Sequence, residues 1–184
     1  MKKSASLLLV FFILASCLEA QRLTKPNRPW NELNPLRGYV NITELTAGPG
    51  LSVTDVPYSK FVAGITTVNG YQINKYLIAG IGVGLNFYNE GYLVPFYISG
   101  RFTYPVPNSK ISPYFNGDLG LLLNFKNSEG GTWTFINPVV GARYTIKPTM
   151  ALDFGVGILT QMNPDEPRDS FLNFKLGLVF LPKR

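Results

Sequence analysis

The chain has 184 residues, with 17 Lys and Arg against 11 Asp and Glu, no histidine and one cysteine. Only 15% of the residues are charged and 14% are aromatic, whereas soluble domains carry about 25% charged residues and disordered chains lack aromatics. The length fits one domain, and the missing histidine excludes Ser-His-Asp triads, Cys-His catalysis and histidine-ligated zinc.

Residues 1–20 are typical of a secretory signal peptide, in which a basic start precedes a short apolar run, here Leu7 to Leu14. A membrane-spanning helix would need about 20 apolar residues. The sequence favours peptidase cleavage after Ala20, although a segment ending at Cys17 resembles a bacterial lipobox and would place a lipid there. With one cysteine, the chain forms no internal disulfide.

Residues 21–35 are rich in Pro, Asn and basic side chains and predict a periplasmic linker without regular structure. Because the protein is predicted to be exported, its positive charge does not indicate a nucleic-acid partner.

Residues 36–184 predict an all-β domain. Segments rich in Val, Ile, Leu, Phe, Tyr and Thr are bounded by Gly, Pro, Asn, Asp or Ser, which is typical of strands and turns. A tilted membrane strand needs about 9–11 residues, whereas the mean soluble strand has about 5–6. The predicted strands have the longer length, at 36–46, 60–71, 76–87, 93–104, 111–125, 132–146, 150–161 and 171–181.

The connectors between these segments alternate in length. The longer set is 47–59, 88–92, 126–131 and 162–170, and the shorter set is 72–75, 105–110 and 147–149. Outer-membrane barrels have an even strand number, short periplasmic turns and longer external loops. We therefore predict an eight-stranded antiparallel up-and-down transmembrane β-barrel.

Alternation along the strands predicts which face meets lipid. The last strand puts Leu172, Phe174, Leu176 and Leu178 on one face, opposite Asn173 and Lys175. Four other strands, 93–104, 111–125, 132–146 and 150–161, repeat this split, whereas 60–71 and 76–87 alternate poorly and predict no facing. The polar faces carry mostly Gly, Ser and Asn, too few charges for a soluble exterior, so the apolar face is predicted to face lipid.

Charged side chains on the polar faces cancel and predict a network in the lumen: Glu44, Arg101, Asp118, Arg143, Asp153 and Lys175. With a three-residue turn at 147–149, Arg143 and Asp153 fall opposite each other on neighbouring strands. A plug of paired side chains is the favoured interpretation, and a narrow ion path is the alternative. Interior glycines are expected to make room for the larger groups: Gly80, Gly82, Gly84, Gly155 and Gly157.

Aromatic residues near the strand ends predict two interfacial belts. The outward-facing members are Phe87 and Phe125 at the loop end and Phe102, Tyr104, Tyr144 and Phe180 at the turn end, whereas Trp133 faces inward by parity.

No catalytic, cofactor or metal site is predicted. Ser99 and Lys175 belong to distant strands, and an Asp118–Asp153 acid pair is less plausible than solvated or paired carboxylates. The glycines of 80–84 lack the spacing of a dinucleotide site, and the acidic segment 163–169 lacks that of a calcium loop.

Residues 36–180 resemble the small outer-membrane β-barrel family of Gram-negative bacteria, the OmpA- and OmpX-type, porin-like group. The last strand, with Phe174, Leu176, Leu178 and Phe180, looks like the signal read by the barrel-assembly machinery, although the chain continues to Arg184. The resemblance implies a bacterial outer-membrane location, membrane lipid and the assembly machinery as partners, and a non-enzymatic structural or loop-mediated role.

Two other functions stay open at this point. One is a narrow channel for small or hydrophobic solutes. The other is a soluble or lipid-anchored, lipocalin-like barrel, which would place Leu172, Phe174, Leu176 and Leu178 inside around an apolar ligand. The sequence predicts neither an external partner nor an oligomeric state.

Overall fold

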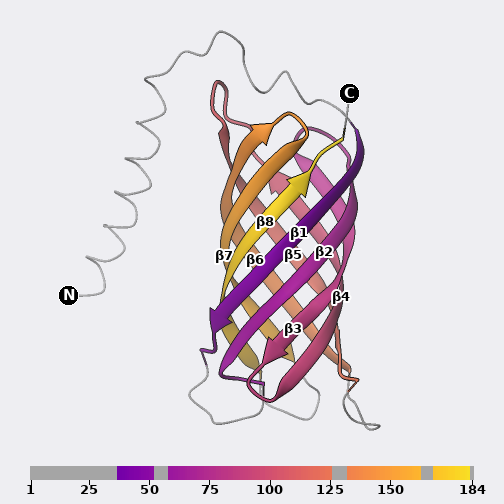
Figure 1. Ribbon diagram of the computed structural model, residues 1–184, viewed down its shortest axis with the longest axis vertical. Helices are drawn as coiled ribbons and strands as arrows, with labels where there is room; N and C mark the ends of the chain where they lie inside the picture. Colours follow the sequence, from indigo (N-terminus) through magenta and orange to yellow (C-terminus); the bar gives the residue numbers. More distant parts are fainter. Residues whose placement is uncertain (1–36, 52–57, 126–131, 163–167, 183–184) are drawn as a thin grey trace, which may run out of the picture.

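The computed structural model describes residues 37–51, 58–125, 132–162 and 168–182. Antiparallel strands, each hydrogen-bonded to the next, close into a barrel when β8 pairs with β1 (Figure 1). The eight strands are β1 Gly38–Pro49, β2 Phe61–Gln72, β3 Leu77–Tyr88, β4 Gly91–Thr103, β5 Ile111–Leu123, β6 Thr132–Lys147, β7 Met150–Met162 and β8 Asp169–Phe180. The predicted fold class is confirmed.

The described part of the chain contains no helix long and apolar enough to cross a membrane. The predicted signal peptide, the possible lipid at Cys17 and the linker 21–35 lie outside the described residues, as do most of the connectors 126–131 and 162–170.

The strand limits differ from the prediction by a few residues. The predicted connector 88–92 is wrong, because Tyr88 pairs with Gly91 and only Asn89 and Glu90 remain between β3 and β4. The first strand runs to Pro49, which pairs with Phe61, instead of ending at residue 46. In both places, strand pairing continues through residues that were predicted to form a connector because of their turn propensity.

The two ends of the barrel differ. The start of β1, the end of β8 and the connectors 73–76, 104–110 and 148–149 share one end, here named the turn end (Figure 1). The opposite loop end carries Asn89 and Glu90 between β3 and β4, and the described residues of the other connectors, which are 50–51, 58–60, 124–125 and 168.

The outer surface of the barrel is apolar, as predicted. Ile98 is 62% exposed, Phe174 51% and Leu176 43%. Soluble monomers rarely expose contiguous apolar patches larger than a few hundred Å². This facing contradicts the lipocalin-like alternative, which placed the apolar side chains of the last strand inside.

Aromatic facing also follows the prediction. The six belt residues are exposed, whereas Trp133 is only 6% exposed and points inward. The exposed belt residues are Phe87, Phe102, Tyr104, Phe125, Tyr144 and Phe180.

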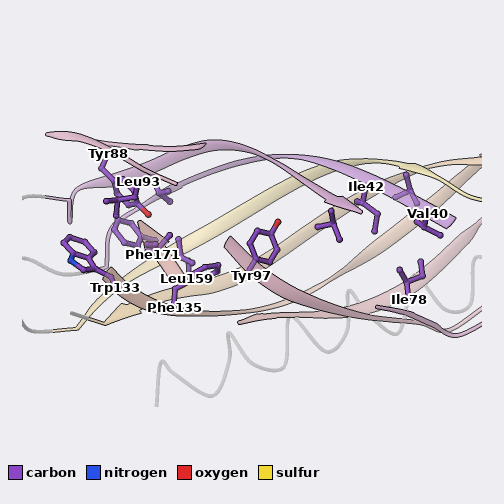
Figure 2. Packing of buried hydrophobic residues seen from close by; sticks show 14 of the residues in the cluster. Val40, Ile42, Ile78, Tyr88, Leu93, Tyr97, Trp133, Phe135, Leu159 and Phe171 are labelled. Carbon is purple, nitrogen blue, oxygen red and sulfur yellow. The ribbon is translucent and has the colours of Figure 1, made fainter. Parts of the chain in front are cut away.

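The interior is less uniformly polar than expected. Buried apolar side chains gather at both ends of the lumen, with Tyr97 between the two groups (Figure 2). The turn-end group contains Val40, Ile42 and Ile78, and the loop-end group contains Tyr88, Leu93, Trp133, Phe135, Leu159 and Phe171. The prediction of a small polar interior is therefore correct only for the middle of the lumen.

Glycines leave the space that the interior aromatic rings occupy. Tyr97 pairs with Gly82 on one side and Gly120 on the other, and a Cβ added at either glycine would overlap Tyr97. Gly82, one of the glycines expected to make room inside the barrel, thus has a specific packing role.

Candidate functional site

The middle of the lumen holds charged side chains from six strands. All are buried, the most exposed being Arg143 and Lys175 at 6%. They are Glu44 on β1, Arg101 on β4, Asp118 on β5, Arg143 on β6, Asp153 on β7 and Lys175 on β8. Three carboxylates face three cations, so the formal charges cancel.

Ion pairs link the six groups into one chain of alternating sign. Its order is Arg143, Asp153, Arg101, Glu44, Lys175 and Asp118. Lys175 Nζ lies 2.9 Å from Glu44 Oε2 and 2.7 Å from Asp118 Oδ2. Each interior member therefore contacts two opposite charges, which offsets the large cost of burying an isolated ion.

The register of β6 and β7 places Arg143 directly opposite Asp153, as the sequence predicted. The connector is shorter than assumed, because β6 runs to Lys147 and leaves Pro148 and Thr149. An irregularity between Thr145 and Lys147 shifts the register by one residue and restores the predicted pairing.

Arg101 joins the two halves of the chain across the lumen. Its guanidinium donates through Nη2 to Glu44 at 2.5 Å and through Nη1 to Asp153. Neither β1 nor β7 is a neighbour of β4 in the sheet. The guanidinium also lies over the ring of Tyr114, 4.8 Å from its centroid, a cation–π arrangement.

Neutral polar groups continue the network beyond Asp118. The Asp118 carboxylate accepts from Ser99 Oγ at 2.7 Å, from Asn116 Nδ2 at 2.9 Å and from Asn137 Nδ2 at 3.3 Å. Asn137 in turn accepts from Asn173 Nδ2 at 3.0 Å. Ser99 and Asn137 are the cross-strand partners of Asp118 on the two neighbouring strands, so these bonds follow from strand register. The Asn173–Asn137 bond joins β8 to β6, which are not neighbours in the sheet, and therefore depends on how the barrel curves.

The arrangement supplies no activated nucleophile or open acid–base pair among the described residues. Ser99 lies against Asp118, and Lys175 is held by two carboxylates. Asp118 and Asp153 each contact cations of their own instead of forming one acid pair. In the same part of the chain, no group of three or more His, Cys, Asp or Glu residues is placed to hold a metal ion.

A cavity of about 20 Å³ lies beside the network, between Thr66, Tyr97 and Asn173. A cavity needs about 10–15 Å³ to hold a water molecule. The space therefore fits about one water.

Comparison with known proteins gives structural matches only. No protein-family model matches the sequence, and no curated protein matches it. The barrel is similar to neisserial surface protein A, with a TM-score of 0.60 and 15% identity over 79% of this chain and 98% of that chain.

Two further solved structures align with the barrel. The N-terminal β-barrel domain of Pseudomonas aeruginosa OprF has a TM-score of 0.48 and 14% identity, over 77% of this chain and 97% of that domain. A de novo designed transmembrane β-barrel has a TM-score of 0.44 and 18% identity, over 77% of this chain and 93% of the design. The first of the three matches shows that the chain has the fold of a small eight-stranded membrane barrel.

Proposed function

We propose that this chain is an integral protein of the bacterial outer membrane, exported by its signal peptide, with a sealed lumen and no enzymatic activity. Its role is structural or uses the connectors of the loop end. The observation that carries this proposal is the neutral ion-pair chain that crosses the lumen through Arg101, with apolar groups at both ends of the barrel.

The packing of the lumen supports sealing. An ion moving along the axis would pass the apolar groups and separate buried pairs such as Arg101 with Glu44, leaving charges unpaired. Unpaired buried charges cost several kcal/mol each. The cavity of about 20 Å³ beside the network is far too small for a solute larger than water.

The alternative function, a narrow ion path, depends on the same charges. Asp153→Asn removes the carboxylate that two guanidiniums share. The heat-dependent gel shift first tests that the Asp153→Asn variant folds. We then expect negligible planar-bilayer conductance for the wild type and for Asp153→Asn. A measurable wild-type conductance that changes with Asp153→Asn would favour the ion path and contradict the sealed lumen.

We also propose that the last strand carries the signal for the barrel-assembly machinery. Phe174, Leu176 and Phe180 are exposed on its outer face and alternate with buried residues. Phe180→Ala is expected to lower the amount of folded protein in the outer membrane. Lys147→Ala, at the same end but outside this strand, is the control and should leave that amount unchanged.

The first experiment is the gel mobility of protein extracted from outer membranes, in SDS, before and after boiling. Closed membrane barrels have every backbone group paired within the sheet, and we expect the unheated protein to migrate differently from the boiled one. Recovery in the soluble fraction without a shift would contradict the membrane function.

A further inference from the structure

The outer face of β1 and β2 carries a polar patch near the turn end. We define it by three cross-strand pairs: Tyr39 with Tyr71, Asn41 with Asn69, and Thr43 with Thr67. Alternation places all six side chains outside, since the residues between them, such as Val40, Ile42 and Val68, are buried in the lumen. This patch explains why the strand 60–71 alternates poorly in sequence.

The strands that flank the patch are apolar on the same face. Asn41 pairs with Phe180 of β8, and Asn69 pairs with Ile81 of β3, both exposed. The patch is therefore a local interruption of a surface that otherwise suits hydrocarbon. Placing polar side chains against hydrocarbon costs free energy, so their presence there indicates a functional site.

Hydrogen bonds inside the patch do not use all of its donors. Asn41 Nδ2 donates to Thr67 Oγ1 at 3.0 Å and to Asn69 Oδ1 at 3.1 Å. Tyr39 OH donates to the same Asn69 oxygen at 2.5 Å. Within the described structure the Asn69 amide nitrogen and the Thr67 hydroxyl hydrogen thus keep unused donor capacity, which suits a ligand rich in acceptor oxygens.

The end of the barrel above the patch is positively charged. Its described charged residues are all cations and are all exposed: Arg37, Lys75, Lys110 and Lys147. Arg37 directly precedes Gly38, which pairs with Gln72, three residues before Lys75. Lys75 lies over the Tyr76 ring at 4.8 Å, and that ring stacks on Phe102. Arg37 is two residues before Tyr39 and Lys75 is four residues after Tyr71, so these two cations are the ones nearest to the patch along the chain.

We propose that the polar patch, together with Arg37 and Lys75, binds an anionic phospholipid of the periplasmic leaflet. The two cations meet the phosphate, and the free donors of Asn69 and Thr67 meet the ester oxygens below it. The proposal rests on the outer-membrane function, which places the turn end in the periplasmic leaflet. Basic surfaces at the membrane boundary attract anionic headgroups.

Charge favours a lipid over a second copy of the chain. A symmetric pair joined through this face would bring the Arg37 and Lys75 side chains of both copies together, and like charges at an interface are unfavourable. An anionic headgroup instead neutralises them.

The test is native mass spectrometry of the full-length folded protein, released from micelles that contain equal amounts of phosphatidylglycerol and phosphatidylcholine. We expect the wild type to retain phosphatidylglycerol at least about fivefold more. Arg37→Gln with Lys75→Gln should abolish this preference. Thr67→Val with Asn69→Leu should reduce retention of both lipids, because both contain the ester oxygens.

Matched controls lie outside the patch. Arg168→Gln removes an exposed cation at the loop end, and Thr160→Val removes a hydroxyl from the outer face of β7. Both should retain lipid as the wild type does. Equal retention of the two lipids by the wild type, or unchanged retention by the patch variants, would overturn the proposal.

Two further outcomes identify what has failed. A lipid-free dimer that disappears in Thr67→Val with Asn69→Leu would overturn the lipid site and make the patch an interface between copies. Each preparation is first tested for the heat-dependent gel shift. A protein that shifts but retains no lipid contradicts only the lipid site, whereas a protein that does not shift contradicts the membrane function as well.

Discussion

Arg143 on β6 and Asp153 on β7 are cross-strand partners, and Arg143 Nε and Nη2 donate to the two oxygens of Asp153 at 2.8 and 2.9 Å. The relationship is unequal. Asp153 has two cationic partners, because it also accepts from Arg101 across the lumen. Among the described residues, Arg143 has one anionic partner, Asp153. Removing either partner should therefore have different consequences.

Asp153→Asn should destabilise the barrel more than Arg143→Met. The first change leaves Arg143 buried without a carboxylate and should lower the free energy of unfolding by about 3–5 kcal/mol. The second leaves Asp153 paired with Arg101 and should lower it by about 1–3 kcal/mol. Urea unfolding in lipid vesicles, followed by tryptophan fluorescence, measures both values.

The control for this comparison is Arg168→Met, which removes an exposed cation and should change the free energy of unfolding by less than about 0.5 kcal/mol. Equal losses for the Asp153 and Arg143 variants would contradict the shared position of Asp153 between Arg143 and Arg101.

Exchanging the two charges should not restore stability. In Arg143→Asp with Asp153→Arg, the new arginine would lie beside Arg101, which contacts Asp153 in the wild type. An isolated cross-strand pair tolerates reversal because only the two partners interact. The double variant should unfold at lower urea than Arg143→Met, and wild-type stability would show that Arg101 does not contact this position.

Gly82→Ala should destabilise the barrel, whereas Gly100→Ala should not. A Cβ at Gly82 would overlap the buried Tyr97 ring, while a Cβ at Gly100 has no neighbouring atom within 4 Å. Overpacking costs about 1–3 kcal/mol, and alanine in open space stabilises by up to about 1 kcal/mol where the backbone suits it. The urea midpoints of the two variants test this difference, and equal midpoints would contradict the assigned packing of Tyr97.

An arginine on the outer face should destabilise the barrel more in the middle of the membrane than near its boundary. Leu176 lies in the middle of β8 and Tyr144 near the turn end of β6, and both are about 40% exposed. In a bilayer, Leu176→Arg should cost about 2–4 kcal/mol and Tyr144→Arg about 0–1 kcal/mol. On a water-facing surface neither change would matter, so equal and negligible effects in vesicles would contradict the lipid-facing assignment.

Several features of this protein followed from local sequence pattern alone. The alternation of Phe174, Lys175 and Leu176 predicted the outward and inward faces of the last strand, because successive side chains of a strand point to opposite sides. Turn residues located the eight strands to within a few positions, and the short connector after β6 brought Arg143 opposite Asp153. These are relationships between residues close in the chain or on consecutive strands.

The tertiary structure decided which side chains meet across the lumen. Arg101 contacts Glu44 and Asp153 only because β8 pairs with β1 and closes the sheet. Alternation with a period of two predicts that a side chain points inward. It does not predict which side chain lies across the lumen, because that depends on barrel closure and strand stagger. For the same reason the apolar lumen ends were missed, because Val40 and Phe171 share the lumen-facing side with polar residues. The sequence thus specified the strands, most of their faces and the Arg143–Asp153 pair, while closure of the sheet specified the contacts across the lumen.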